Sequence, residues 1–217
     1  MALNGNIVDG VQPEMTEEVR EVMLRIGPEA CLVLNYDVTA GLDTLSRSLH
    51  TPRSDPLRMR IQSIVAREFK CDLSTLSAVI TKCPNMNVLW LERSEFRSEA
   101  FGALEAALME SINLEALCLK RQHLSDSGAK VVANVLTKWK NKSLKTLYLG
   151  YCSIGHEGVQ AISSSLLRMP SAASVNHLDL TANFLKPQGA TYLSNVLKEN
   201  RRIRVLRLGA NGIEDAG

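Results

Sequence analysis

One apolar pattern, repeated along the chain, constrains the fold more than any other feature of the sequence. Its form is L-x-x-L-x-L-x-x-N/C-x-L followed by a small residue, and five copies lie one after another. The copies begin at Met86, Leu114, Leu144, Val175 and Ile203, so successive starts are separated by 28, 30, 31 and 28 residues. A period of this size indicates a solenoid, because each short unit can bury its apolar face only against its neighbours.

Each copy predicts a strand followed by a helix. The L-x-L alternation turns the leucines of a short strand to one side of a sheet. Two apolar residues four positions apart then follow, and that spacing places them on one face of a helix. These pairs are Leu104 and Leu108, Val132 and Leu136, Ile162 and Leu166, and Leu193 and Leu197. We therefore predict an α/β fold with a parallel sheet on one side and helices on the other.

A short polar or thiol side chain near the end of the pattern predicts a buried turn. Asn183, Asn211 and Cys152 occupy this position, where such a side chain can satisfy backbone groups inside the stack. Gln122 and Ser94 depart from the consensus. We expect the turns of those two repeats to be less regular.

The regularity of the pattern suggests three segments. Residues 86–217 are predicted to hold the regular repeats, the last of them incomplete. Residues 29–85 are predicted to hold degenerate repeats with a basic loop at 50–60, and residues 1–28 an N-terminal capping helix segment. Because the last copy stops where its helix should begin, we expect further chain or another subunit to cover the C-terminal edge.

Repeats of about 28 residues with Asn and Cys sharing the turn position resemble the ribonuclease-inhibitor-like subfamily of leucine-rich repeats. The resemblance implies a horseshoe-shaped solenoid with the parallel β-sheet on its concave face and the α-helices on its convex face. It also implies a non-catalytic protein–protein interaction module or scaffold that binds a protein partner through the concave face and adjacent loops. Two alternatives stay open: a GTPase-activating regulator resembling the Ran-activating family, and a structural subunit of a large cytoskeletal or ciliary assembly.

The residues between the strand leucines point away from the helices, so we expect them to line a solvated concave face. Large aromatic and arginine side chains on such a face are typical of binding hot spots. The predicted protein-binding residues are Trp90, Arg93, Arg121, Tyr148, Tyr151, Asp179 and Arg207. The alternative interpretation is that Trp90 and Tyr148 merely stack across neighbouring strands.

Two basic clusters form a second candidate site. Lys138, Lys140, Lys142 and Lys145 surround Trp139, and a second cluster consists of Arg201, Arg202, Arg204 and Arg207. Basic residues with an interleaved aromatic are found in nucleic-acid-binding proteins. Favourable charge near helix C-termini is the more common cause, and the formal net charge is only +2. We therefore do not expect a nucleic acid as partner.

No sequence motif indicates catalysis. Phosphate-binding, dinucleotide-binding, zinc-protease and serine-hydrolase motifs are all missing, and His50, His123, His156 and His177 are scattered over different repeats. We expect no enzyme activity, no catalytic residue, no cofactor, no metal site and no small-molecule substrate.

The five cysteines are odd in number and include no C-x-x-C pair. The first residues lack the pattern of a secretion signal, and no apolar stretch is long enough to span a bilayer. The predicted location is the cytoplasm, with cytoskeletal association or the nucleus as alternatives, and neither secretion nor membrane insertion is expected.

Overall fold

The computed structural model of the chain describes residues 24, 30–35, 59–67, 73–94, 101–168 and 175–214. Within them, seven parallel strands form one sheet whose order follows the chain, from β1 to β7. The strands are β1 (Cys31–Asn35), β2 (Ser63–Arg67), β3 (Val88–Glu92), β4 (Ala116–Cys118), β5 (Thr146–Tyr148), β6 (His177–Asp179) and β7 (Val205–Arg207). The helices are α4 (Leu73–Ile80), α5 (Phe101–Glu110), α6 (Ser125–Lys138), α7 (His156–Arg168) and α8 (Lys186–Glu199).

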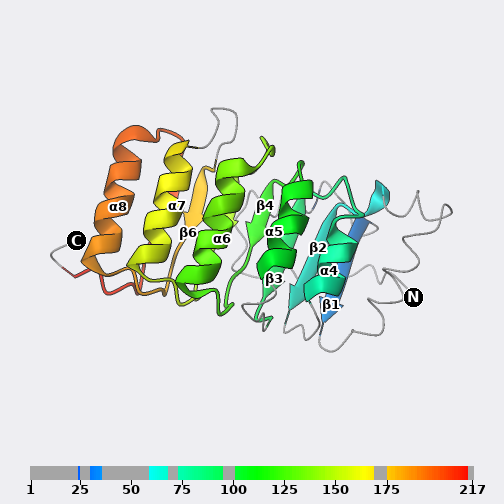
Figure 1. Ribbon diagram of the computed structural model, residues 1–217, viewed down its shortest axis with the longest axis horizontal. Coiled ribbons are helices and arrows are strands. Elements are labelled where there is room, and N and C mark those ends of the chain that lie inside the picture. Colours follow the sequence, from blue (N-terminus) through cyan, green and yellow to red (C-terminus); the bar gives the residue numbers. More distant parts are fainter. Residues whose placement is uncertain are drawn as a thin grey trace.

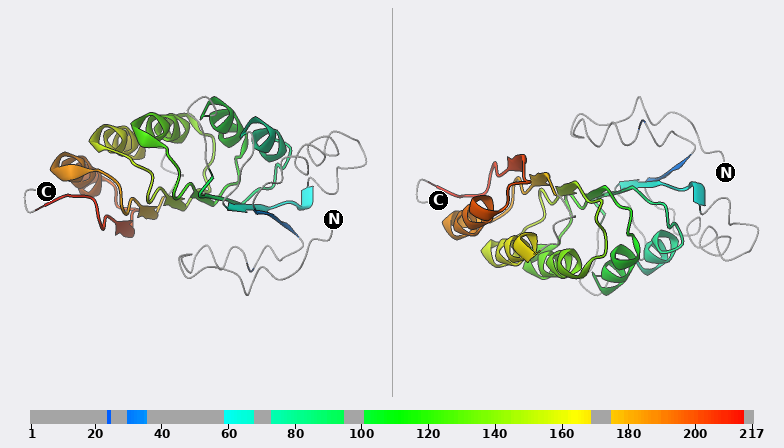
Figure 2. Two further views of the ribbon diagram at one scale, coloured as in Figure 1. Left: turned by 90° about the horizontal axis from the view of Figure 1, so that it is seen from below. Right: turned by 90° about the horizontal axis from the view of Figure 1, so that it is seen from above.

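The described helices all cover the same face of the sheet (Figures 1 and 2). Each helix follows its strand and packs beside the helix of the next repeat, so the strands run in one direction and the helices return in the other. The predicted α/β solenoid is confirmed.

The strand register pairs equivalent repeat positions with one another. The residue between the second and third leucines forms a continuous row across β3 to β7. We call this set the mid-strand row; its members are Trp90, Cys118, Tyr148, Asp179 and Arg207. Because the register is in phase, each position of the repeat has one environment that recurs along the solenoid.

The main core lies between the sheet and the helices. The strand leucines of the repeats up to β6 are buried there, together with all the predicted helix pairs except Leu197, whereas Leu206 and Leu208, in and beside β7, are partly buried. Leu197 is 42% exposed, so the expectation that it would be covered is wrong. Leu136 and Leu166 occupy the equivalent position in helices that have a following helix beside them, whereas no described helix lies beyond α8.

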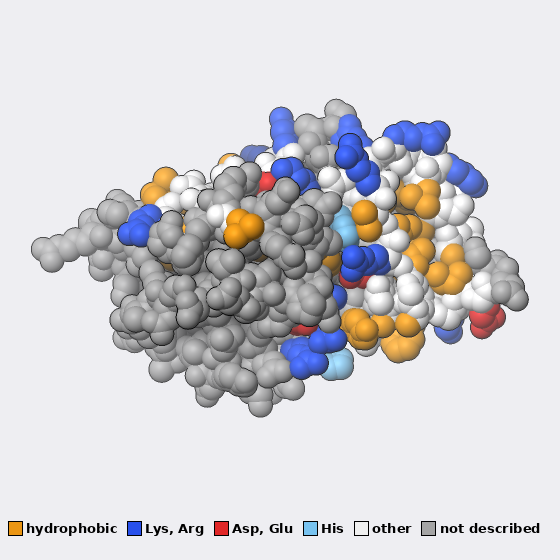
Figure 3. All heavy atoms as spheres, turned by 180° about the vertical axis from the view of Figure 1, so that it is seen from behind, with side chains coloured by type: hydrophobic (Ala, Val, Ile, Leu, Met, Phe, Trp, Pro, Cys, Tyr) orange, Lys and Arg blue, Asp and Glu red, His pale blue; other side chains and the backbone are white. Residues whose placement is uncertain are grey.

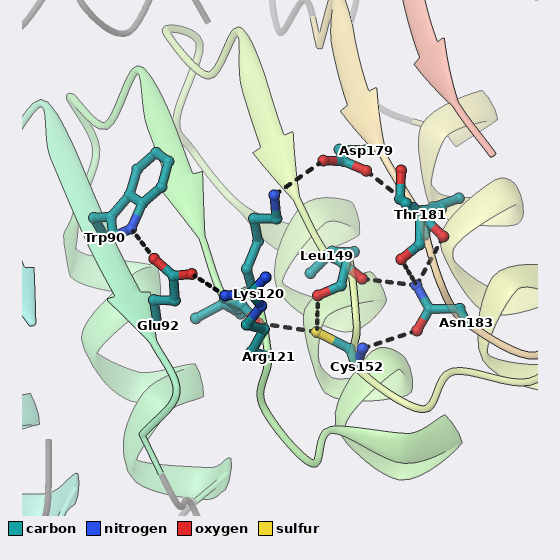
Figure 4. A network of polar contacts seen from close by, with 12 residues as sticks. Trp90, Glu92, Lys120, Arg121, Leu149, Cys152, Asp179, Thr181 and Asn183 are labelled. Atoms are coloured by element: carbon teal, nitrogen blue, oxygen red, sulfur yellow. Dashed lines mark hydrogen bonds and ion pairs between the residues drawn. The ribbon is translucent and has the colours of Figure 1, made fainter. Parts of the chain in front are cut away.

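The Asn turns bond the repeats to one another, as predicted. Asn183 Nδ2 donates to the backbone oxygens of Leu149 (2.8 Å) and Leu180 (2.9 Å), and its Oδ1 accepts from the backbone N–H groups of Cys152 and Ile154, both at 3.0 Å (Figure 4). One buried side chain thereby satisfies four backbone groups, two of them donors of the preceding repeat.

The turns with Gln122 and Ser94 are less complete. Gln122 Nε2 donates to the Leu91 oxygen of the preceding repeat at 3.0 Å. In the next repeat, Cys152 Sγ makes the equivalent bond to the Leu119 oxygen. Gln122 Oε1 is buried without a hydrogen-bond partner among the described residues. Ser94 Oγ donates within its own turn, to the Glu92 oxygen. The predicted loss of regularity is therefore a loss of side-chain bonds, while the sheet continues unchanged.

Several predictions fall largely outside the described residues. Of the predicted capping segment 1–28 only Leu24 is described, and of the basic loop 50–60 only Met59 and Arg60. Strands β1 and β2 and helix α4 lie where the degenerate repeats are predicted. The boundaries of the three segments stay predictions.

Candidate protein-binding surface

The mid-strand row is buried along most of its length. Trp90 and Tyr148 are 0% exposed, and Cys118 and Asp179 are equally inaccessible. The expectation that Trp90, Tyr148 and Asp179 would lie on a solvated face is therefore wrong. Arg207, on β7, is the member of the row that is exposed.

The two buried aromatic rings pack against each other across three strands. Trp90 of β3 and Tyr148 of β5 stand on either side of Cys118 of β4, and the small thiol side chain leaves room for the rings to meet. Their centroids are 5.3 Å apart with the planes tilted by 53°, a favourable aromatic geometry. The ring of His177 lies 5.3 Å from Tyr148 on the other side. The two rings thus contact each other, as the alternative interpretation expected, but from β3 and β5 with β4 between them.

Charged side chains surround these rings, and each is paired (Figure 4). Trp90 Nε1 donates to Glu92 Oε2 at 3.3 Å, and Arg121 Nη1 donates to Glu92 Oε1 at 3.4 Å. Lys120 Nζ lies 3.6 Å from Asp179 Oδ2. Buried charges are costly unless an opposite charge compensates them, and Glu92, Lys120 and Asp179 all meet that condition. We call these residues, with Trp90 and Tyr148, the polar layer.

Burial also changes the thiols next to the polar layer. Burial raises the pKa of Cys118 well above its ordinary value. Burial likewise raises the pKa of Cys152 to about 12. Both thiols stay protonated at neutral pH, so neither is a nucleophile in the folded chain.

A second row of residues lies at the carboxyl ends of the strands, two positions after the third leucine of each repeat. We call it the loop row; its members are Arg93, Arg121, Tyr151, Ala182 and Ala210. All five have left-handed backbone, with φ between 52° and 58°. Residues other than glycine adopt such angles only where the surrounding structure holds them.

Backbone hydrogen bonds between repeats hold the loop row in place. The N–H of Arg121 donates to the Gly150 oxygen at 2.9 Å, and that of Tyr151 donates to the Thr181 oxygen at 2.8 Å. Arg93 and Ala182 make the equivalent bonds to the next repeat. The loop row therefore has a fixed backbone, although it lies at the surface.

The loop row and the adjacent loop present the exposed aromatics. Tyr151 is 47% exposed, and the guanidinium carbon of Arg121 lies 5.0 Å from the centre of its ring. Arg93 is exposed, and Phe184, in the loop of the next repeat, is 62% exposed. Arginine and large aromatic side chains are over-represented in interface hot spots.

The structure thus divides the seven predicted site residues. It brings Arg93, Arg121 and Tyr151 together at the surface, whereas the other four lie in the mid-strand row. Phe184 was missed by the sequence prediction. Its signal is a large apolar residue between the turn Asn183 and the buried Leu185, a position where the repeats beside it have Ser153 and Gly212.

Trp139 does not offer an aromatic face to a nucleic acid. Its side chain is 4% exposed and belongs to the core, while Lys138, Lys140 and Lys142 around it are exposed. The interpretation of this segment as basic residues around an available aromatic is therefore wrong.

The described part of the chain has neither a metal-binding cluster nor a membrane-spanning helix. No group of three His, Cys, Asp or Glu side chains there could hold a metal ion. No described helix is long and apolar enough to cross a membrane.

Comparison with known proteins shows similarity to repeat proteins. The Leucine Rich repeat family matches residues 140–163. Ribonuclease inhibitor of Sus scrofa is 26% identical over 198 residues, which cover 89% of this chain and 42% of the inhibitor. NACHT, LRR and PYD domains-containing protein 13 of Homo sapiens is 25% identical over 171 residues, which cover 65% of this chain and 16% of that protein. The chain thus spans less than half the length of these relatives.

One solved structure shows a weaker likeness. Leiomodin-1 Actin-Binding Site 2 superposes with a TM-score of 0.45 and 21% identity, covering 52% of this chain and 64% of that one. A likeness at this level carries no argument about function.

Proposed function

Because this chain is a leucine-rich-repeat protein of the ribonuclease-inhibitor-like kind, we propose that it is a non-catalytic recognition module that binds a protein partner through the loop row and Phe184. Leucine-rich-repeat domains generally mediate protein–protein interaction. The observation that carries the proposal is the exposure of Arg93, Tyr151 and Phe184 on one edge.

A rigid backbone supports this assignment. The inter-repeat hydrogen bonds and the left-handed conformation fix where each loop-row side chain leaves the surface. Binding then costs less conformational entropy of the loops than it would if the loops were mobile. Tyrosine and phenylalanine also offer a large contact area with few rotatable bonds.

The polar layer contacts the loop row through Arg121. Arg121 contacts the buried Glu92 carboxylate on one side and the exposed Tyr151 ring on the other. In this proposal Glu92 is a positioning residue, because it holds the guanidinium under the ring without reaching the surface itself. The buried Trp90 and Tyr148 contribute stability and do not contact the partner.

The reducing interior of the cell is the proposed location. Among the described residues, Cys118 and Cys152 are free thiols and both are buried. A chain of this type in an oxidising compartment would more commonly pair its cysteines.

Quantitative capture from a cytoplasmic extract, with cross-linking and mass spectrometry, tests the proposal. The variant Arg93→Ala/Tyr151→Ala/Phe184→Ala should lose at least about tenfold of the specifically captured partner, because hot-spot side chains each contribute more than about 1 kcal/mol. The matched control is Gln160→Ala/Ser164→Ala, two exposed positions of α7. Capture that is equal for the wild type and the folded triple variant would refute the loop row as the binding site.

The identity of the captured partner also separates the remaining functions. A small GTPase whose hydrolysis rate rises on adding the chain would favour the regulator over the simple recognition module. Cytoskeletal or ciliary subunits lost in the triple variant would favour the structural role.

A further inference from the structure

The edge of the solenoid opposite the loop row is basic over its last three helices. Each of α6, α7 and α8 has a cation in its last turn, namely Lys138, Arg168 and Lys198, whereas α4 and α5 have none there. Lysine and arginine side chains gather along this edge, at the top of the molecule in Figure 3. The charge therefore begins at one point of the solenoid and then recurs with the repeat.

A second set of cations lies in the loops that lead back to β5 and β7, whereas the repeat between them has Ala173 and Asn176 at the corresponding positions. Lys142 and Arg201 occupy one equivalent position, two residues before the first apolar anchor, and Lys145 and Arg204 occupy another, one residue after it. All four are exposed. We call these residues and the three last-turn cations the basic edge.

Among the described residues, one carboxylate forms an ion pair with a cation of the basic edge: Glu115 Oε2 lies 2.8 Å from Lys145 Nζ. Glu199, next to Lys198, is exposed. The three helix C-termini add roughly half a negative charge each. Among the described residues, no carboxylate forms an ion pair with Lys138, Arg168 or Lys198. Helix-dipole compensation therefore accounts for only a minor part of this charge.

Exposed leucines alternate with the cations. Leu167 and Leu197 immediately precede Arg168 and Lys198, and they are 41% and 42% exposed. Large apolar side chains beside unpaired cations match a partner that carries both carboxylates and apolar side chains. A nucleic acid fits less well, because Trp139 is buried and cannot stack on a base.

A polar hollow continues this edge toward the N-terminal repeats. It encloses about 280 Å³ and is lined by Gln62, Asn85, Asn87, Asn113, Glu115 and Ser143. The Asn85, Asn87 and Asn113 amides of the hollow donate to the backbone oxygens of Met59, Asn113 and Pro84. The hollow thus adds polar surface beside the cations.

We propose that the basic edge binds an extended acidic segment of a protein partner, on a surface separate from the loop row. Neighbouring helices pack about 8–10 Å apart, and an extended chain rises about 3.3 Å per residue. The segment therefore carries a carboxylate at about every third position, with apolar side chains between them to contact Leu167 and Leu197.

Fluorescence anisotropy with the full chain and a synthetic peptide tests this inference. The probe is a labelled 13-residue peptide with Glu at every third position and Leu between. The variant Lys138→Glu/Arg168→Glu/Lys198→Glu should weaken binding at least about tenfold, because three attractive contacts become repulsive. The matched control Lys138→Arg/Arg168→Lys/Lys198→Arg keeps every charge and should bind within about twofold of the wild type.

Three further binding measurements, with a rearranged peptide, an oligonucleotide and lipid vesicles, could overturn the inference. The same peptide with its Glu residues moved to one end should bind more weakly, and equal binding would refute the spacing. Tighter binding of a 12-nucleotide oligouridine, or of phosphatidylcholine vesicles with 30 mole per cent phosphatidylserine, would overturn the choice of an acidic protein. Circular dichroism shows that the variants are folded; a folded charge-reversal variant that binds the peptide normally would refute the basic edge.

Discussion

The mid-strand row and the loop row are three residues apart in every repeat, and from β3 to β6 the mid-strand residue is buried whereas the loop-row residue is at least partly exposed. Trp90 and Tyr148 are 0% exposed, whereas Tyr151, only three positions after Tyr148, is 47% exposed. The two tyrosines are chemically identical, so side-chain type does not explain the difference. The mid-strand residues lie in extended strands, while each loop-row residue has left-handed backbone where the strand ends.

The same contrast holds for charge. The Lys120–Asp179 pair of the polar layer is almost inaccessible to solvent, whereas the Lys130–Glu157 pair between α6 and α7 is more than half exposed at both residues. A charge in the interior depends on its partner, because water cannot replace it. A charge at the surface loses little when its partner is removed. Position in the repeat therefore determines whether a polar residue stabilises the fold or remains available for binding.

The largest expected effect comes from the buried aromatics. Trp90→Ala or Tyr148→Ala should lower the free energy of unfolding by about 3–5 kcal/mol, because a large cavity opens across three strands. Tyr151→Ala should cost less than about 1 kcal/mol, since its ring is half exposed and loses mainly a cation–π contact. Urea denaturation measures all three. Similar losses for Tyr148→Ala and Tyr151→Ala would contradict the division between the two rows.

The second-largest loss of stability is expected at the buried Lys120–Asp179 ion pair. Asp179→Ala should cost about 3 kcal/mol, because it leaves Lys120 buried without the carboxylate and frees the N–H of Thr181. Lys120→Met/Asp179→Leu should recover part of that loss by removing both charges. A double-mutant cycle by denaturation gives the coupling, and a coupling near zero would show that the pair does not act as a unit.

The buried thiol of Cys152 predicts a dependence on alkaline pH. Its pKa is raised to about 12 by burial, so it keeps its proton in the folded chain while the unfolded chain loses it above about pH 9. The contribution of the protonated Cys152 thiol to the free energy of unfolding is complete below pH 9 and is lost as the pH rises towards 12. At pH 10 the free energy of unfolding is lower by about 1.4 kcal/mol. Denaturation between pH 7 and 10 measures how steeply the free energy of unfolding falls with pH. Cys152→Ala should make this fall shallower, and an unchanged slope would exclude the Cys152 thiol as its source.

The smallest effect is expected at the exposed ion pair. The Lys130 ammonium lowers the pKa of Glu157, and Glu157 raises the pKa of Lys130, through a direct 2.8 Å contact. Because both groups are exposed, Lys130→Ala should change the melting temperature very little, and the change should vanish in 0.5 M salt. Thermal melts in low and high salt provide the measurement. A loss as large as that of Asp179→Ala would overturn the contrast between surface and interior.

Much of the fold was predictable because the repeat signal is local. The strand leucines, the helix pairs and the turn residues Asn183 and Asn211 each have a role set by their own repeat and its neighbour. Leu197 was predicted wrongly because its burial depends on a helix beyond α8, which its own sequence pattern does not contain. Gln122 shows the same limit, since only the structure shows which of its two polar atoms finds a partner.

The sequence alone determined the period, the strand–helix order and the inward-facing residues, because a side chain with a fixed repeat position meets the same neighbours in every unit. The tertiary structure decided which of the remaining residues are exposed. Trp90 and Tyr148 lean across Cys118 from different repeats, and Arg93, Arg121 and Tyr151 turn outward because hydrogen bonds to the next repeat hold a left-handed backbone. Exposure depends on groups distant in sequence. For this reason the sequence predicted a binding face in the middle of the strands, whereas the exposed aromatics lie at the strand ends.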